Sequence, residues 1–318
     1  MEIGLVLPQM EGAMDGATPR WPDIAAMAGR AEEVGLDSIW LIDHLVVRTE
    51  GRGSPWKGLW ECWTALAGLA AVTSTIRLGS LVAATSLRNP TLLAKMADTV
   101  DEISGGRLIV GLGAGSYPQE HQAFGYPWDR RVDRFEEALT VIAALLKTGR
   151  ADYDGTFYSA RDCELKPRPR LEGGPPILVG AIAHGPRMLR LAARHADMWN
   201  AWLVFGESHP KVIAPLREAV DAACRDVGRD PATLTRTATV LVDLADAYAY
   251  GVDVPLRLRE RRSVSAVTGT PNEIAATLRE FGEQGIDQLQ VCLAPNTLAA
   301  LSKFAEIVEI LRAGGTNE

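Results

Sequence analysis

The chain has 318 residues, of which 47% are hydrophobic, and a formal net charge of −7 at neutral pH. This length and apolar content suit one large domain or two small ones, with an ample core. The negative charge argues against nucleic acid or an anionic membrane surface as a partner, and no apolar run is long enough to span a bilayer.

Eight short apolar runs predict buried β-strands, and each is followed by a segment with helical periodicity. The predicted strands are residues 3–7, 38–42, 76–82, 108–111, 177–179, 196–200, 237–242 and 288–293. The predicted helices are residues 21–34, 61–72, 89–104, 130–146, 186–194, 209–227, 270–284 and 297–312. Gly35 and Gly285 end two of these helices and Pro186 opens a third, as expected from the conformations these residues favour.

The segment 79–116 shows this alternation most clearly. One apolar strand ends near Val82 and the next ends near Val110, with a helix between them that has an apolar stripe. Small residues follow both strands. Because parallel sheets bind ligands at the carboxyl ends of their strands, a site is expected after Val82 and after Val110.

Eight strand–helix repeats predict an α/β protein, a (β/α)8 TIM barrel that forms a single domain over residues 1–318. Insertions are expected near 150–176 and 244–264, and Asp154-Gly155 in the first is typical of a hairpin turn. A doubly wound sheet is the competing architecture. It is disfavoured because the dinucleotide-binding fingerprint is incomplete: after Gly111 and Gly113, residue 116 is Ser rather than Gly.

Asp43 and His44 directly follow a strand that is otherwise almost wholly apolar. In a barrel this position faces the ligand-binding edge, where an imidazole can give or take a proton near neutral pH. The alternative is an aspartate that caps the next turn beside a solvated histidine.

Two further loops are candidates for binding a ring or a phosphate. The glycines from Gly111 to Gly115 permit close approach of the backbone, although a tight turn would look the same. Gly180 and Ala181 precede the helix that begins at Pro186, whose free N–H groups could bind phosphate with help from Arg187. A plain strand-to-helix connection is the alternative.

Aromatic residues mark a possible substrate pocket. Trp199 and Asn200 close a predicted strand, so an indole and an amide could face the site, although Trp199 could equally belong to the core. Trp56, Trp60 and Trp63 cluster in the second strand-to-helix segment and could wall a pocket or simply pack a loop.

Several classes of protein lack support. The four cysteines and five histidines show no metal-ligand spacing, so no metal site is expected. No G-x-S-x-G elbow supports a hydrolase. The opening segment has no basic stretch before its short apolar run, so no signal peptide is predicted and a cytoplasmic protein is expected.

Segments from Ile3 to about Leu311 resemble the luciferase-like monooxygenase superfamily, in particular its branch that uses coenzyme F420. They are AEEVGLDSIWLIDHL (31–45), WTALAGLAAVTSTIRLGSLV (63–82), RNPTLLAKMADTVDEISGGRLIVGLGAGSYPQEHQAFG (88–125), RFEEALTVI (134–142), PPILVGAIAHGPRMLRLAARHADMWN (175–200) and VTGTPNEIAATL (267–278). Flavin-using and F420-using members share these motifs. The resemblance implies a (β/α)8 barrel with insertions, in agreement with the count of elements.

The resemblance also implies roles at matching positions. His44 would lie by the deazaflavin ring and act on a proton, and Asp43 would contact the ring. Leu81-Val82 falls where the family often has a bulge with a non-prolyl cis peptide bond behind the ring, so Leu81 and Val82 are expected to contact the cofactor. The residues expected to line the cofactor or bind its phosphate are Thr85, Ala114, Gly115, Ser116, Tyr117, Gly180 and Ala181.

One position departs from the family pattern. F420-dependent sugar-phosphate and alcohol dehydrogenases carry a glutamate where this chain has Ser116, and a serine hydroxyl is a poor base. Reduction of a C=C, C=N or C=O bond needs only hydride delivery and a proton donor, which His44 could be. We therefore expect an F420-dependent oxidoreductase acting on a small organic substrate.

Other interpretations stay open at this point. An FMN-dependent monooxygenase on the same fold and a non-catalytic flavin or F420 carrier are the alternatives. Trp56, Trp60 and the 244–264 insertion are candidates for shaping the substrate pocket, and a homodimer is possible. The cations placed to meet the acidic tail of F420 are Arg48, Arg52, Lys57 and Arg88.

Overall fold

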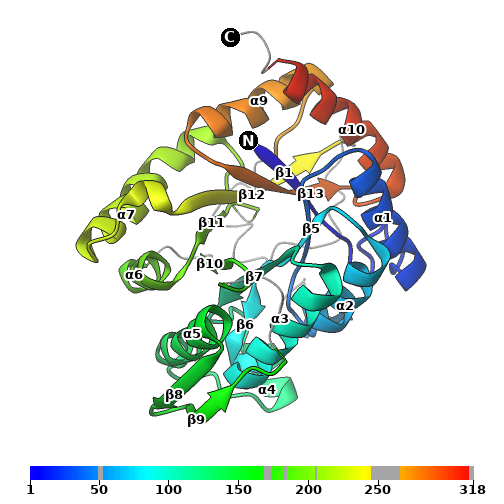
Figure 1. Cartoon of the computed structure of the whole chain (residues 1–318). Helices are drawn as coiled ribbons and strands as arrows, with labels where there is room; N and C mark the ends of the chain where they lie inside the picture. The colour runs from blue at the N-terminus through cyan, green and yellow to red at the C-terminus, as the bar shows by residue number, and fades with distance from the viewer. Residues whose placement is uncertain (49–52, 168–172, 182–184, 205, 245–265, 315–318) are drawn as a thin grey trace.

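A computed structural model describes residues 1–48, 53–167, 173–181, 185–204, 206–244 and 266–314. Eight parallel strands form its centre and helices surround them (Figure 1). The strands are β1 (Glu2–Val6), β2 (Ser38–Leu41), β5 (Arg77–Ser80), β7 (Leu108–Gly113), β10 (Ile177–Ala181), β11 (Met198–Trp202), β12 (Thr235–Asp243) and β13 (Gln288–Ala294). The principal helices are α1 (Trp21–Glu33), α2 (Cys62–Val72), α3 (Pro90–Ser104), α5 (Arg131–Thr148), α6 (Pro186–His195), α7 (Ile213–Asp226), α9 (Pro271–Glu283) and α10 (Leu298–Ala313).

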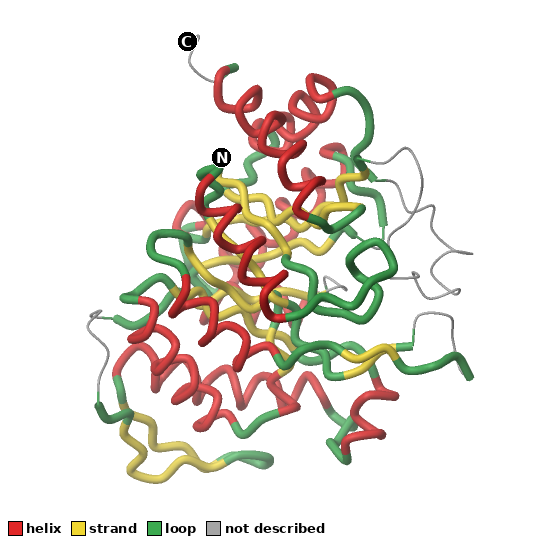
Figure 2. The backbone as a smooth tube through the Cα atoms, turned by 90° about the vertical axis from the view of Figure 1, so that its right-hand side faces the viewer, coloured by secondary structure: helices red, strands yellow, loops and turns green. Residues whose placement is uncertain are grey.

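The sheet closes on itself. Its strand order is β10-β11-β12-β13-β1-β2-β5-β7, and β10 also pairs with β7 in parallel. This confirms the predicted (β/α)8 barrel and excludes the doubly wound sheet, which would stay open. A short strand, β6 (Ala83–Ala84), continues from the end of β5 and pairs with β7. In the side view of Figure 2 the strands lie enclosed by the helices.

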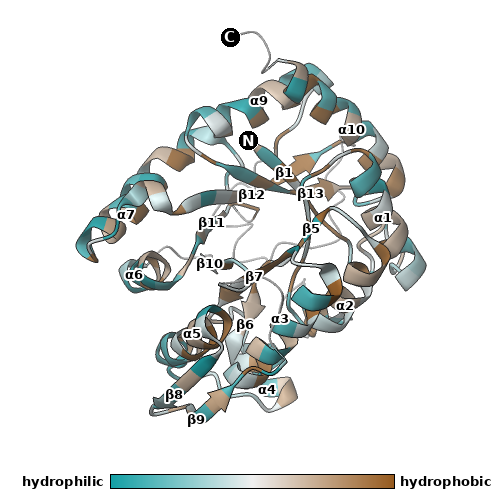
Figure 3. Ribbon diagram, viewed as in Figure 1, coloured by the Kyte–Doolittle hydropathy of each residue, from teal (hydrophilic) through white to brown (hydrophobic). Residues whose placement is uncertain are grey.

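Two buried layers alternate along each strand, as the two-residue period of a strand requires. Residues such as Ile39, Val110 and Val179 pack outward against the helices in one large cluster. Their neighbours Trp40 and Ile109 belong to a second cluster inside the barrel. The helices carry both hydrophilic and hydrophobic residues, as helices with one face on a barrel should (Figure 3).

Trp40 fills the barrel interior because its neighbours are glycines. A Cβ placed on Gly79 would lie 2.2 Å from the Trp40 ring, and one on Gly4 would lie 2.6 Å from the indole nitrogen. The indole N–H donates to Ser38 Oγ at 2.8 Å, so the buried polar atom of the ring is satisfied. Small residues at these two strand positions therefore let a single large ring plug the barrel.

A buried polar network occupies the interior on the β11–β13 side. The Asn200 amide donates to Thr237 Oγ1 and Gln290 Oε1, both at 2.9 Å. Gln290 in turn donates to Gln288, which donates to Ser38. Because buried polar groups are costly without partners, this network fixes how these strands face the interior.

The first predicted insertion is an antiparallel hairpin of β8 (Arg150–Asp154) and β9 (Ser159–Glu164) beside α5 (Figure 1). Glu137 on α5 anchors its turn by accepting backbone N–H groups of Thr156, Phe157 and Tyr158. The second predicted insertion, 244–264, lies outside the described residues apart from Leu244. That residues 1–318 form a single domain stays a prediction. Across the described ranges, no helix is long and apolar enough to cross a membrane.

Candidate functional site

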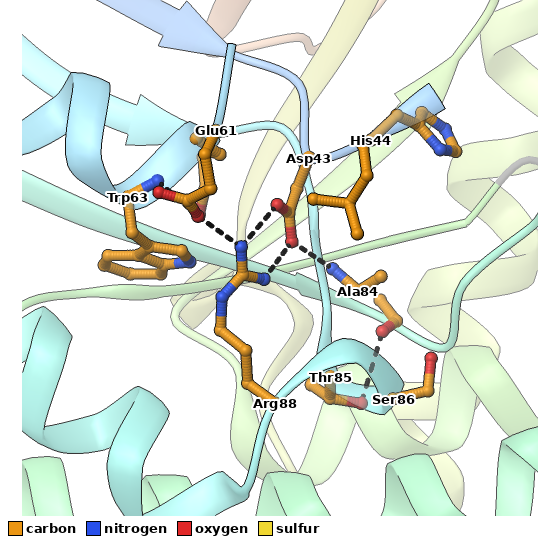
Figure 4. A network of polar contacts seen from close by, with 12 residues as sticks. Asp43, His44, Glu61, Trp63, Ala84, Thr85, Ser86 and Arg88 are labelled. Atoms are coloured by element: carbon orange, nitrogen blue, oxygen red, sulfur yellow. Dashed lines mark hydrogen bonds and ion pairs between the residues drawn. The ribbon is translucent and has the colours of Figure 1, made fainter. Parts of the chain in front are cut away.

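Asp43 is the centre of a buried ion-pair network at the carboxyl ends of the strands, which we call the carboxyl edge of the barrel (Figure 4). Its carboxylate accepts two hydrogen bonds from Arg88, at 2.6 and 2.9 Å, and one from the backbone N–H of Ala84 at 3.0 Å. Arg88 also donates to Glu61, which caps the start of α2 by accepting the N–H groups of Trp63 and Thr64. One guanidinium thus joins the loops after β2 and β5 to α2.

This network is largely removed from water. The Asp43 side chain is 0% exposed and that of Arg88 is 11% exposed. Burial raises the pKa of Asp43, and the hydrogen bonds and charge of Arg88 oppose that rise. Burial would lower the pKa of Arg88, but hydrogen bonds and charge from Asp43 and Glu61 outweigh it and raise the pKa. Each group therefore depends on its partner.

These contacts leave Arg88 no free role as a cation for an acidic cofactor tail, because two carboxylates of the protein already use its guanidinium. Arg52 lies outside the described residues. Direct contact of Asp43 with a cofactor stays a prediction, and in this structure the carboxylate faces Arg88 instead. In this structure Asp43 and Arg88 hold the loop after β2 and the loop after β5 together.

His44 points away from Asp43 (Figure 4), and its imidazole pairs with a second carboxylate, that of Glu120. Its Nδ1 lies 3.0 Å from Glu120 Oε2, and its side chain is 25% exposed while that of Glu120 is 1% exposed. Glu120 belongs to a short helix, α4 (Pro118–Phe124), that follows β7. Its other oxygen accepts the backbone N–H groups of Leu45 and Val46.

Burial would raise the pKa of Glu120, but the hydrogen bond and charge of His44 and the backbone N–H groups of Leu45 and Val46 lower it overall. Glu120 is therefore an ionised, buried carboxylate at neutral pH. An imidazole held by such a carboxylate, with its ring partly in solvent, is the arrangement of a group that transfers protons.

Aromatic rings extend from His44 along the loop after β2. The Tyr117 ring meets the His44 ring edge-on at 6.3 Å and the Trp56 ring edge-on at 6.4 Å. The Arg48 guanidinium lies 4.2 Å over Trp56, and the Arg48 backbone N–H donates to the Tyr117 hydroxyl at 2.9 Å. The short ladder of β3 (Val46–Val47) and β4 (Lys57–Gly58) is thereby attached to the start of α4.

The Leu81–Val82 peptide bond is cis, as the family resemblance implied. The glycines around it make room for the protein itself. A Cβ on Gly113 would lie 2.7 Å from a Val82 methyl, and one on Gly111 would lie 1.9 Å from the Ser80 carbonyl oxygen. Close approach of the backbone is thus used at Gly111 and Gly113 to seat the residues at the end of β5.

Several apolar side chains lie half-buried on the barrel-interior cluster and reach solvent at the carboxyl edge. They are Ile42, Val82, Trp202 and Ala266. Ala114 and Gly115 are likewise half-buried in the loop after β7. An apolar surface of this kind beside the polar His44 suits a flat ring that is apolar on its faces and polar at its rim, so these residues fit a flavin or deazaflavin.

The remaining predicted cofactor residues lie close to this surface or carry its frame. Thr85 is buried and donates to the Gly113 carbonyl at 3.4 Å, whereas Ser116 is exposed. Gly115 adopts a φ of +80°, and a Cβ there would lie 3.1 Å from both His121 and Ser86. His121 is itself buried, with Nε2 at 2.8 Å from Ser86 Oγ and Nδ1 at 3.0 Å from the Tyr117 carbonyl.

The predicted phosphate site is partly described. Gly180 and Ala181 end β10, and a Cβ on Gly180 would lie 3.1 Å from Val82. Arg187 turns instead to α5, where it pairs with Asp133 and Glu136. Phosphate binding by the backbone at the end of β10 stays a prediction, without the contribution expected from Arg187.

Two predicted pocket residues do not reach the carboxyl edge. Trp199 is 2% exposed and belongs to the cluster between strands and helices, so the alternative of a core tryptophan holds. Asn200 faces the interior but is also buried, with its amide engaged by Thr237 and Gln290. Trp60 is 45% exposed, its indole donating to the Pro19 carbonyl. Trp63 is a core residue.

Sequence reasoning missed Glu120, the partner of His44, and three of the four apolar residues, namely Ile42, Trp202 and Ala266. Glu120 follows a different strand, and only its place after β7 could have pointed to it. Trp202 has the same parity along β11 as Asn200 and so faces the interior, whereas the predicted strand ended at residue 200. No cluster of three metal-ligating side chains occurs in the described ranges.

A closed parallel barrel with an acid–histidine pair beside a half-exposed apolar surface defines a (β/α)8 protein with a candidate active site at the carboxyl edge. The sequence profile described as "Luciferase-like monooxygenase" matches residues 1–250. The chain therefore belongs to that family.

Named relatives are oxidoreductases. A phthiodiolone/phenolphthiodiolone dimycocerosates ketoreductase of Mycobacterium tuberculosis is 34% identical over 236 residues, 69% of this chain and 60% of the relative. A pyrimidine monooxygenase RutA of Cronobacter sakazakii is 36% identical over 185 residues, 57% of this chain and 53% of the relative. Each match thus spans little more than half of the curated relative.

The fold is shared with an F420-dependent secondary alcohol dehydrogenase solved in complex with an F420–acetone adduct. The TM-score is 0.77 at 18% identity, over 98% of this chain and 99% of that one. The family and the named relatives support an enzyme of the oxidoreductase kind, whereas the likeness to this solved structure, at 18% identity, supports the fold alone.

Proposed function

We propose that the chain is a coenzyme F420-dependent oxidoreductase that reduces a small organic substrate. The observation that carries this proposal is His44, held at Nδ1 by Glu120 and partly exposed beside the half-buried apolar surface of Ile42, Val82 and Trp202. A bound reduced F420 would supply a hydride at C5. His44 would exchange the accompanying proton through Nε2, and the apolar surface would orient the flat reactants and exclude water.

The chain's own residues fit the parts of such a cofactor. Val82, Ala114 and Gly115 would bind the ring, and Tyr117 would lie at its edge next to His44. Backbone groups of Gly180 and Ala181 would bind the phosphate. Lys57 on β4 and Arg48, the residue after β3, remain the candidates for the acidic tail, now without Arg88.

Two residues favour reduction over alcohol oxidation. Ser116 cannot act as the carboxylate base that dehydrogenases of this kind carry at its position. Glu120 does not replace it, because its side chain is 1% exposed and both its oxygens already accept hydrogen bonds. The ketoreductase name of one relative agrees with reduction of a carbonyl group.

The test begins with a binding titration of the full chain against F420 and FMN, each oxidised and reduced, followed by ring fluorescence and absorbance. Tight binding of F420 and weak binding of FMN is expected. A panel of ketones, imines and activated alkenes then tests for oxidation of reduced F420. His44→Ala should retain F420 binding and lose turnover by about 10²–10⁴-fold. Full turnover in that variant would remove the role given to His44.

An FMN-dependent monooxygenase is the second candidate, favoured by the 36% identity to a pyrimidine monooxygenase. Preference for FMN in the titration, together with substrate-dependent consumption of oxygen, would replace the first proposal by this one. Tight cofactor binding without turnover on any substrate would favour the third reading, a non-catalytic carrier. Homodimer formation stays a proposal, to be tested by light scattering.

A further inference from the structure

We infer that Glu120 is a positioning residue that fixes the tautomer of His44, so that neutral His44 presents the lone pair of Nε2, and not an N–H, at the carboxyl edge. The inference concerns the protein without any cofactor. Only its catalytic meaning rests on the proposed function.

The hydrogen-bond capacity of Glu120 determines which nitrogen of His44 carries the proton. A carboxylate can only accept, and this one is buried and ionised at neutral pH. Its contact with His44 Nδ1, at 3.0 Å, therefore requires a proton on Nδ1. A neutral imidazole carries a single ring proton, so Nε2 must be the unprotonated nitrogen.

The other oxygen of Glu120 makes the arrangement rigid. It accepts the backbone N–H groups of Leu45 and Val46, the two residues that follow His44. One carboxylate thus fixes both the ring and the chain that carries it, and rotation of the ring away from Glu120 would leave a buried charge without one of its donors. The tautomer is thus set by a residue of α4, the short helix after β7, which lies 76 residues along the chain from His44.

The consequence concerns proton transfer. With a lone pair on Nε2, neutral His44 takes a proton from a hydroxyl group or from water. The imidazolium it then becomes faces the ionised Glu120, which stabilises its charge, and Nε2–H can donate to a developing alkoxide. The opposite tautomer would present Nε2–H to the substrate, but that imidazole would be neutral and would carry no positive charge to balance the alkoxide.

Glu120→Gln gives a sharp test because a glutamine has only one acceptor atom. The backbone N–H groups of Leu45 and Val46 need that oxygen, so the side-chain NH₂ is directed at His44 Nδ1. An NH₂ group donates, so Nδ1 must accept, and the proton of neutral His44 moves to Nε2. The substitution should therefore invert the tautomer while preserving the size and shape of the side chain.

The measurement is two-bond ¹H–¹⁵N correlation spectroscopy of the full chain labelled with ¹⁵N-histidine, at a pH where His44 is neutral and without cofactor. His44→Gln identifies the His44 signals by their loss. His121 provides an internal control in the same short helix, because its Nδ1 faces the Tyr117 carbonyl and must stay protonated. An unchanged His121 pattern shows that α4 is intact in the variant.

We expect the Nδ1–H tautomer of His44 in the wild-type chain and the Nε2–H tautomer in Glu120→Gln, with His121 unchanged. A wild-type spectrum with Nε2–H at His44 would overturn the inference, as would a variant that keeps Nδ1–H. If the His121 pattern also changes, the wild-type spectrum alone decides. Failure of the F420 proposal would appear in the cofactor titration and leave these spectra unaffected.

Discussion

Removal of Arg88 should destabilise the folded chain more than removal of most partly exposed arginines would. In Arg88→Met the Asp43 carboxylate, 0% exposed, loses both hydrogen bonds from the guanidinium and keeps only the Ala84 N–H. Breaking a buried pair by deleting one partner costs about 3–5 kcal/mol, because an uncompensated charge stays behind. We expect a loss of this size in the free energy of unfolding, measured by urea denaturation at pH 7.

The pH dependence and a double variant make this prediction specific. Burial already raises the pKa of Asp43 in the folded chain, and loss of Arg88 should raise it further. A folded-state pKa above the unfolded one means that the penalty is absent below the unfolded pKa and complete above the folded pKa, so the loss should be smaller at about pH 5 than at pH 8. Adding Asp43→Asn removes the buried charge and keeps an acceptor for the Ala84 N–H, so it should restore most of the loss. A cost below about 1 kcal/mol for Arg88→Met, or no recovery in the double variant, would refute the buried ion pair as a stabilising element.

Three other substitutions test contacts that hold the barrel together away from the carboxyl edge, each by urea denaturation. Glu32 accepts three backbone N–H groups after α2, and these hydrogen bonds outweigh burial and lower its pKa to about 2. Glu32→Gln should therefore lower the free energy of unfolding at pH 7. The difference from wild type should shrink as the pH falls from about 4.5 towards 2, where Glu32 becomes protonated. Gly79→Ala should cost about 1–3 kcal/mol, because its Cβ would meet the Trp40 ring at 2.2 Å. The matched control Gly29→Ala, in α1 with open space around it, should instead stabilise by about 0.5–1 kcal/mol. Arg107→Lys should lose about 1–3 kcal/mol, because a single ammonium cannot reproduce the guanidinium bonds to the carbonyls of residues 70, 73, 76 and 104.

Most of the fold could be predicted because its strands are buried on both faces and read as continuous apolar runs. The differences that matter most for the site are at the carboxyl ends of β7 and β11, where the apolar runs stop although the strands continue. β7 extends to Gly113, two residues beyond its predicted end, and β11 extends to Trp202. Because the predicted strand ended at residue 200, Trp199 was a predicted pocket residue although it lies on the outward face of β11, and Trp202 at the carboxyl edge was not predicted. The residues that the sequence did not reveal are thus those nearest the site.

Only some residues of the candidate site could be predicted from the sequence. Asp43 and His44 are visible in the sequence as polar residues that interrupt an apolar pattern at a strand end. Their partners are not, since Arg88 lies 45 residues and Glu120 lies 76 residues along the chain. Pairing of this kind depends on the order of the parallel strands, because β2, β5 and β7 are neighbours in the sheet and the loops after them lie side by side, and no local periodicity encodes it.

The two partners hold His44 in different ways, and the variants proposed for them separate these functions. Arg88 fixes the backbone on one side of His44 through Asp43, and its loss leaves a buried charge, so stability should fall. Glu120 holds the ring itself and the following N–H groups, and Glu120→Gln keeps an acceptor for those groups, so the tautomer should change at a smaller cost in stability. If the two contacts were not independent, each substitution would change both the free energy of unfolding and the tautomer of His44. A stability loss confined to Arg88→Met and a tautomer change confined to Glu120→Gln would show that the closed barrel positions this histidine through two independent contacts.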